Sequence, residues 1–142
     1  MATTKVLLDS GPLVGFLVET DQHHRWAAEI WGQLYEPLWA CEAVLSEVIF
    51  LLQSGGVSID PLLKLFERGL VKIDFRVSSH QPDVWQLLRK YADLPMSLAD
   101  ACLVRMAELT DNCQIFTTDK DFLVYRRKGR SRIPLITPYS LT

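Results

Sequence analysis

Short apolar runs of strand character alternate along this chain with longer stretches of helical periodicity. Strands are predicted for residues 6–8, 71–75, 114–118 and 135–136, and helical stretches fill most of the intervals between them. Strands that are joined through helices need crossover connections, and such connections pair strands in parallel. We therefore expect an α/β fold with a central, mostly parallel sheet flanked by helices.

Helices are predicted wherever apolar residues recur every three to four positions. The predicted helices cover 13–19, 22–34, 42–53, 60–68, 82–91 and a stretch from 98 to about 109 that Ser97 caps. Proline near a helix start and glycine after its end support several of these bounds. Pro12 and Pro61 are such starts, with Asp60 as the expected cap, and Gly55 is such an end.

The length and composition fit one folded domain. The chain has 142 residues, of which 49% are hydrophobic and 23% are charged, so we expect a single domain over 1–142 and no extensive disorder. The net charge of −2 lacks the basic field of many nucleic-acid binders. A nucleic-acid partner would therefore be bound by a local basic patch or through metal ions.

The three cysteines, Cys41, Cys102 and Cys113, form no C-x-x-C pair and suggest neither a zinc site nor a disulfide framework. We expect buried free thiols, which favour a reducing compartment. The N-terminal residues lack the apolar stretch of a signal peptide, and no run reaches the roughly 20 apolar residues of a membrane span. We therefore expect a cytoplasmic protein without a membrane partner.

Two aspartates directly follow predicted strands. Asp9 ends the run Val6 to Leu8, and Asp119 follows the strand at 114–118. Sites in open parallel sheets gather at the carboxyl ends of strands, so these two carboxylates would face each other if the strands are neighbours. The alternative is that each aspartate caps the next element.

Glu47 interrupts a stretch that is apolar nearly all round, from Ala43 to Leu52. Such a helix is expected to be buried, and a buried carboxylate is costly unless it is paired or binds a metal. The alternative to a metal site is an ion pair with an arginine, for example Arg105.

Asp100 lies three residues after Ser97, at the spacing of a capping box. By itself this position favours a structural role, and Asp100 also shares a helix face with Glu108 and Asp111, as on a solvated surface. An acid in the first turn can nevertheless point into a neighbouring site.

Several carboxylates that converge on one point repel each other and raise each other's pKa. A hard divalent cation removes this conflict, and Mg²⁺ or Mn²⁺ suits a few carboxylates, several waters and substrate phosphates. Such a site supports in-line displacement at phosphorus.

Four segments that contain these acids resemble the PIN-domain nucleases, and among them the VapC-like toxins. The segments are VLLDSGPLVGFL, LSEVIFLL, SLADACLVRMAE and IFTTDKDF, in this order. The resemblance implies a Rossmann-like three-layer fold and metal-dependent cleavage of RNA by an endoribonuclease. It also implies a homodimer and, for a toxin, an antitoxin protein that blocks the site.

The resemblance further implies the roles of single residues. The four family acids correspond to Asp9, Glu47, Asp100 and Asp119, which would be catalytic and would hold the metal, with Asp9 and Asp100 as the most direct ligands. Secondary roles fall to Ser10, whose hydroxyl would support the metal or a phosphate, and to Asp121.

A basic run follows the last acid and includes Arg126, Arg127 and Lys128. It would lie where an RNA backbone approaches the carboxylates, although most such runs are solvated loops.

The sequence also leaves other functions open. A haloacid-type phosphatase is disfavoured because Gly11 stands where its second aspartate is needed, whereas a catalytically inactive PIN-like module that binds RNA or protein is the main alternative.

Overall fold

The central sheet in the computed structural model, which describes residues 3–139, has five strands in the order β3-β2-β1-β4-β7. All neighbouring strands are parallel. The strands are β1 (Lys5–Leu8), β2 (Leu38–Ala40), β3 (Val71–Ile73), β4 (Cys113–Phe116) and β7 (Leu135–Ile136). The predicted α/β class with a mostly parallel sheet is therefore confirmed.

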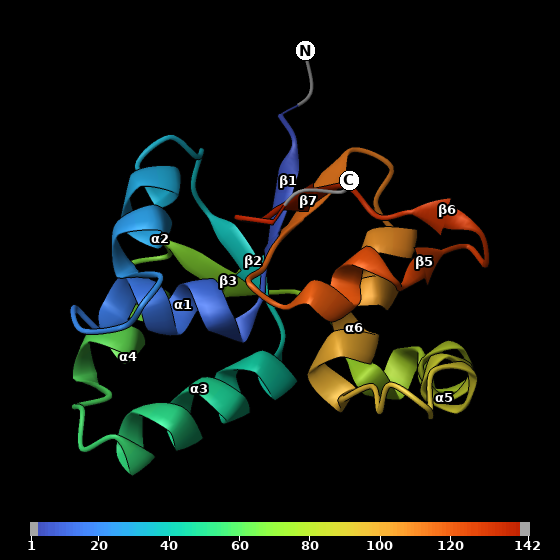
Figure 1. The fold of residues 1–142 in the computed structure, drawn as a ribbon, viewed down its shortest axis with the longest axis horizontal. Coiled ribbons are helices and arrows are strands. Elements are labelled where there is room, and N and C mark those ends of the chain that lie inside the picture. The colour runs from blue at the N-terminus through green and yellow to red at the C-terminus, as the bar shows by residue number, and fades with distance from the viewer. Residues whose placement is uncertain (1–2, 140–142) are drawn as a thin grey trace.

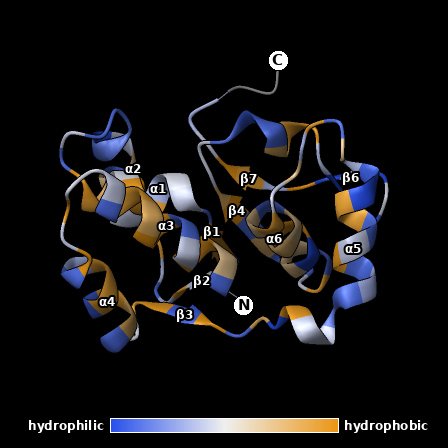
Figure 2. Cartoon of the chain, turned by 90° about the horizontal axis from the view of Figure 1, so that it is seen from below, coloured by the Kyte–Doolittle hydropathy of each residue, from blue (hydrophilic) through white to orange (hydrophobic). Residues whose placement is uncertain are grey.

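Helices cover both faces of this sheet. They are α1 (Ser10–Leu17), α2 (His24–Trp31), α3 (Glu42–Ser54), α4 (Asp60–Glu67), α5 (Gln81–Lys90) and α6 (Leu98–Glu108). Figure 1 shows the sheet with α1 and α2 on one side and α6 on the other. Seen from below, α3 and α4 join the first group and α5 joins the second (Figure 2). The arrangement has three layers, as the resemblance implied.

The strand order changes direction at β1. The chain moves from β1 to β2 and β3 on one side, and β4 then pairs with the other edge of β1. Leu8 is in register with Phe116, and the Asp9 backbone N–H donates to the Phe116 carbonyl over 3.0 Å. The carboxyl ends of β1 and β4 are thus level at a topological switch point, where ligands bind in sheets of this kind.

Side chains of β1, β4 and α6 dominate the core around this point. Leu7, Leu8, Ile115, Phe116 and Leu103 have no measurable solvent exposure. Such complete burial fixes the two strand ends relative to α6, because a packed interior leaves little room for displacement.

Several bounds differ from those expected. The first helix begins at Ser10 rather than at 13, because the Asp9 side chain accepts a hydrogen bond from the Ser10 N–H and caps the helix. Asp60 is the first residue of α4 and not its cap, which is Ile59. The sequence prediction missed β2, since three residues between Pro37 and Cys41 carry too little periodicity.

Shorter elements complete the described chain. A 3₁₀ helix, η1 (Val77–Ser79), precedes α5, and a second, η2 (Lys120–Leu123), follows β4. An antiparallel hairpin of β5 (Arg126–Arg127) and β6 (Ser131–Arg132) comes next. None of the described helices has the length and apolar character that a membrane crossing requires. The three cysteines are buried and free, as expected.

Candidate functional site

Five carboxylates line one open pocket of about 650 Å³ at the carboxyl edge of the sheet. They belong to Asp9, Glu47, Asp100, Asp119 and Asp121. Four separate regions supply them: the end of β1, helix α3, the first turn of α6, and the segment from the end of β4 into η2. The start of α6 and one end of α3 meet at this edge in Figure 1. The predicted convergence of the four acids on one pocket is therefore what the geometry shows.

Asp9 is held rigidly at the base of the pocket, where it is 5% exposed. Its Oδ1 accepts from the Ser10 N–H over 2.8 Å, and its Oδ2 accepts from the Thr117 hydroxyl over 2.7 Å. Burial raises the pKa of Asp9 to about 7, and the charges of Asp100 and Asp119 push it in the same direction, against the Thr117 hydrogen bond. Asp9 therefore both caps α1 and belongs to the carboxylate pocket.

Asp100 is also buried, at 8% exposure, so a solvated helix face is excluded for it. Its backbone N–H donates to the Ser97 hydroxyl over 3.1 Å, which confirms the predicted cap. Its Oδ2 accepts from the Tyr125 hydroxyl over 2.8 Å. Burial raises the pKa of Asp100 to about 6, and the charge of Asp119 adds to this effect.

Glu47 enters the pocket from α3 and accepts a 2.5 Å hydrogen bond from the Ser10 hydroxyl at Oε1. The alternative ion pair with Arg105 is wrong, because this guanidinium contacts Asp83 at 3.5 Å and Glu108 at 3.2 Å instead. Ser10 thus orients a carboxylate in this structure.

The predicted burial of the whole helix around Glu47 is wrong. Helix α3 is not buried on all sides, since Phe50 is 67% exposed and Leu51 is 48% exposed. Glu47 itself is half-buried. The apolar sequence of this helix therefore reflects one face in the core and another, apolar, face at the surface.

Asp119 and Asp121 form the tightest cluster together with Asp100. One carboxylate oxygen of each lies within 4.8 Å of one of each of the others. The Asp121 N–H donates to Asp119 Oδ1 over 2.9 Å, and the Asp119 N–H donates to the Thr117 hydroxyl over 2.9 Å. Burial and the charge of Asp119 raise the pKa of Asp121. Asp121, which the sequence indicated as secondary, is thus geometrically central.

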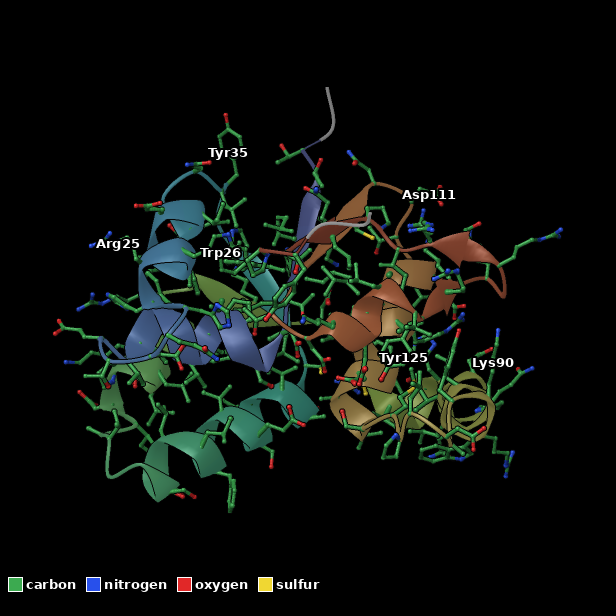
Figure 3. All side chains as sticks on the ribbon, viewed as in Figure 1. Arg25, Trp26, Tyr35, Lys90, Asp111 and Tyr125 are labelled. Atoms are coloured by element: carbon green, nitrogen blue, oxygen red, sulfur yellow. The ribbon has the colours of Figure 1, made fainter. Side chains whose placement is uncertain are left out.

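Two residues that support the acids escaped the sequence analysis. Thr117 links Asp9 to the Asp119 backbone through one hydroxyl group, and Tyr125 binds Asp100. Thr117 lies in the segment of the fourth acid, so its position could have indicated a role. Tyr125 is a lone aromatic 25 residues from its partner, and no local pattern indicates the contact. In Figure 3 its label lies beside α6.

No residue of the basic run lines the acid pocket, contrary to expectation. The Arg126 guanidinium donates to the carbonyls of residues 123–125, and that of Arg127 donates to the carbonyls of Ala107 and Thr110. Lys128 is 3.7 Å from a carboxylate oxygen of Asp111. Arg127 therefore provides hydrogen-bond donors for carbonyl groups at the carboxyl end of α6, the end opposite Asp100. RNA contact by this run stays a prediction.

The donor set of the pocket fits a hard divalent cation. All of its charged oxygen donors are carboxylates, and three of them have pKa values raised by burial and by like charges. Oxygens on one Mg²⁺ at about 2.1 Å lie at most about 4.2 Å apart. The spacing of the cluster of Asp100, Asp119 and Asp121 therefore needs only a small contraction to surround one ion.

The chain is similar to known proteins in sequence pattern and in fold. The family model of the PIN domain matches residues 6–128. The chain belongs to the PIN domain family. Its fold is similar to that of VapC20 from Mycobacterium tuberculosis, a toxin that cleaves the sarcin–ricin loop, with a TM-score of 0.74 and 16% sequence identity. The similarity covers 92% of this chain and 99% of the VapC20 chain. No curated protein matches the sequence.

Proposed function

We propose that this PIN-domain protein is a Mg²⁺- or Mn²⁺-dependent endoribonuclease that hydrolyses phosphodiester bonds of RNA. The observation that carries the proposal is the convergence of five carboxylates on one open pocket at the sheet switch point. A module that only binds RNA gains nothing from such a repulsive cluster, because its charges repel phosphates. Divalent ions turn the same cluster into a centre for displacement at phosphorus.

The arrangement suggests a division of roles. Asp100, Asp119 and Asp121 would hold one ion, since their oxygens are closest together. Asp9 would complete the ligand set from the base of the pocket. A bound ion would supply a Lewis acid and an activated water. Thr117 and Tyr125 would fix the direction of the carboxylates, as the outer partners of metal ligands commonly do.

Glu47 would contribute a carboxylate oxygen to the site from α3. The Ser10 hydroxyl occupies one of its oxygens, which leaves the other oxygen available to a water or an ion. Ser10 itself sits at the start of α1, where a phosphate oxygen would meet backbone N–H groups.

We further propose that the protein is the toxin of a toxin–antitoxin pair and works in the cytoplasm as a homodimer. The fold shared with VapC20 and the buried free thiols support this proposal. Exposed apolar side chains offer surfaces for partners, for example Phe50 on α3, the helix that also carries Glu47.

The test is incubation of a mixed RNA pool with the protein, with Mg²⁺ or with EDTA, followed by sequencing of the new ends. We expect defined new ends with Mg²⁺ only, and none from the Asp119→Asn variant. Asp111→Asn is the matched control, because this aspartate is fully exposed and precedes the amino end of β4. RNA binding without cleavage by the wild-type protein would instead indicate an inactive RNA-binding module.

A further inference from the structure

The acid pocket has one side of different chemistry. Among the described residues that line it, Lys120 is the only cation and Tyr139 the only aromatic residue. Lys120 begins η2 directly after Asp119. Tyr139 follows β7, whose carboxyl end lies at the same edge of the sheet as those of β1 and β4. Neither residue has a part in holding the carboxylates.

Lys120 and Tyr139 contact each other at the pocket. The Lys120 ammonium lies 4.8 Å from the centre of the Tyr139 ring. The His23 and Tyr139 rings form a T-shaped contact, with centroids 6.4 Å apart and planes at 85°. The Tyr139 N–H donates to the hydroxyl of Thr137, two residues earlier, over 3.4 Å. The Tyr139 ring is thus positioned at the pocket by its contacts with Lys120 and His23.

We propose that Tyr139 stacks on the base of a nucleotide next to the cleaved bond, and that Lys120 contacts a phosphate of that nucleotide. This inference rests on the proposed ribonuclease function. A base is uncharged and flat, so it can pack beside a pocket with five carboxylates without adding charge repulsion. The pocket volume of about 650 Å³ is in the range of sites that enclose a small ligand.

The relative strength of the contacts favours this exchange. Stacking of a base on an aromatic side chain strengthens binding by roughly 5- to 160-fold. An exposed cation–π contact contributes roughly 2- to 5-fold. A base can therefore replace the Lys120 ammonium on the Tyr139 ring, which frees the ammonium for the adjacent phosphate. Because every base offers a π face, the contact selects an unpaired nucleotide and not a particular base.

The experiment uses a single-stranded RNA oligonucleotide that spans a mapped cleavage site, and a series of oligonucleotides with one abasic nucleotide each. For the wild-type protein we expect one position beside the cleaved bond at which loss of the base raises KM at least about fivefold, with little change in kcat. Tyr139→Ala should raise KM for the intact RNA to a similar extent and should lose the abasic effect. Tyr139→Trp should retain the wild-type KM and the abasic effect.

Matched controls separate stacking from support of the fold. Tyr35→Ala removes a tyrosine that is 79% exposed and points outward beyond α2 (Figure 3), and it should leave both readouts unchanged. If Tyr139→Ala fails to fold, Tyr139→Leu keeps apolar volume without the aromatic face and gives the same test. Lys120→Gln should raise KM and reduce the salt dependence of binding by about one phosphate contact, whereas Lys64→Gln, in an exposed helix pair, should not.

An abasic effect that persists unchanged in Tyr139→Ala would overturn the stacking role, because two groups that contact each other must show coupled effects. RNA cleavage itself would then still stand. A wild-type protein that cleaves no RNA with Mg²⁺ or Mn²⁺ would overturn the proposed function, and this inference with it.

Discussion

In the absence of metal, the stability of the Asp9→Asn variant relative to wild type should be greater at high pH than at low pH. Asp9 is 5% exposed, and its pKa is raised from 3.8 to about 7. The folded state therefore keeps a proton that the unfolded chain loses near pH 4. Between these two values the free energy of unfolding of the wild-type protein falls as the pH rises.

The magnitude follows from the shift. Each pH unit between about 4 and 7 costs the wild-type fold about 1.4 kcal/mol through Asp9 alone. From pH 5 to pH 7 the cost is about 2.3 kcal/mol, because Asp9 is already half ionised in the folded state at pH 7. Asparagine has no charge to bury and can keep both contacts, since its carbonyl accepts from the Ser10 N–H and its amide donates to the Thr117 hydroxyl. An imperfect hydrogen bond adds a cost of about 1 kcal/mol that does not depend on pH.

The assay is thermal or urea unfolding of both proteins with EDTA, at pH 5 and at pH 8. The stability of Asp9→Asn relative to wild type should rise by about 2 to 3 kcal/mol between these pH values, or very roughly 5 to 10 °C in Tm. Asp111→Asn, which alters a fully exposed aspartate, should show no such rise. A pH-independent difference between wild type and Asp9→Asn would refute the claim that Asp9 is buried as a strained carboxylate.

Three further predictions concern contacts of single residues. Thr117→Val should lower the cleavage rate about 10- to 100-fold, measured on a mapped RNA, because it releases Asp9. Tyr125→Phe should weaken Mn²⁺ binding about 10- to 100-fold by calorimetry, since Asp100 loses its hydroxyl partner; unchanged affinity would contradict this role. Arg127→Gln should lower the free energy of unfolding by about 1 to 2 kcal/mol in urea, because its guanidinium caps the end of α6. Unchanged stability with weaker RNA binding would instead restore a contact of Arg127 with RNA.

The sequence predicted the parts of the site that depend on strand ends. Asp9 and Asp119 each follow an apolar strand, and parallel pairing of β1 with β4 brings both to one edge. The pairing itself depends on a shared core and not on local pattern, so only the structure shows that the two strands are neighbours. Asp100 was ambiguous because a capping position does not determine where the carboxylate points.

Other features depend on contacts between distant residues that local periodicity does not record. Glu47 was identified from a burial argument that the exposed Phe50 contradicts, yet the residue does enter the pocket. Tyr125 lies shortly after η2, and only the path of the chain there brings its hydroxyl to Asp100. The turn after η2 carries Arg127 to the far end of α6, a contact that the sequence pattern did not indicate.

The central claim is that the carboxylate pocket cleaves RNA, and the rate of Mn²⁺-dependent cleavage by Asp100→Asn tests it most directly. The loss of an outer partner of a metal ligand already costs about 10- to 100-fold. Loss of a ligand in the cluster of Asp100, Asp119 and Asp121 should therefore lower the rate at least about 100-fold. The variant should remain folded, with the buried negative charge removed. A folded Asp100→Asn protein that cleaves the same bond within about threefold of the wild-type rate would contradict the account.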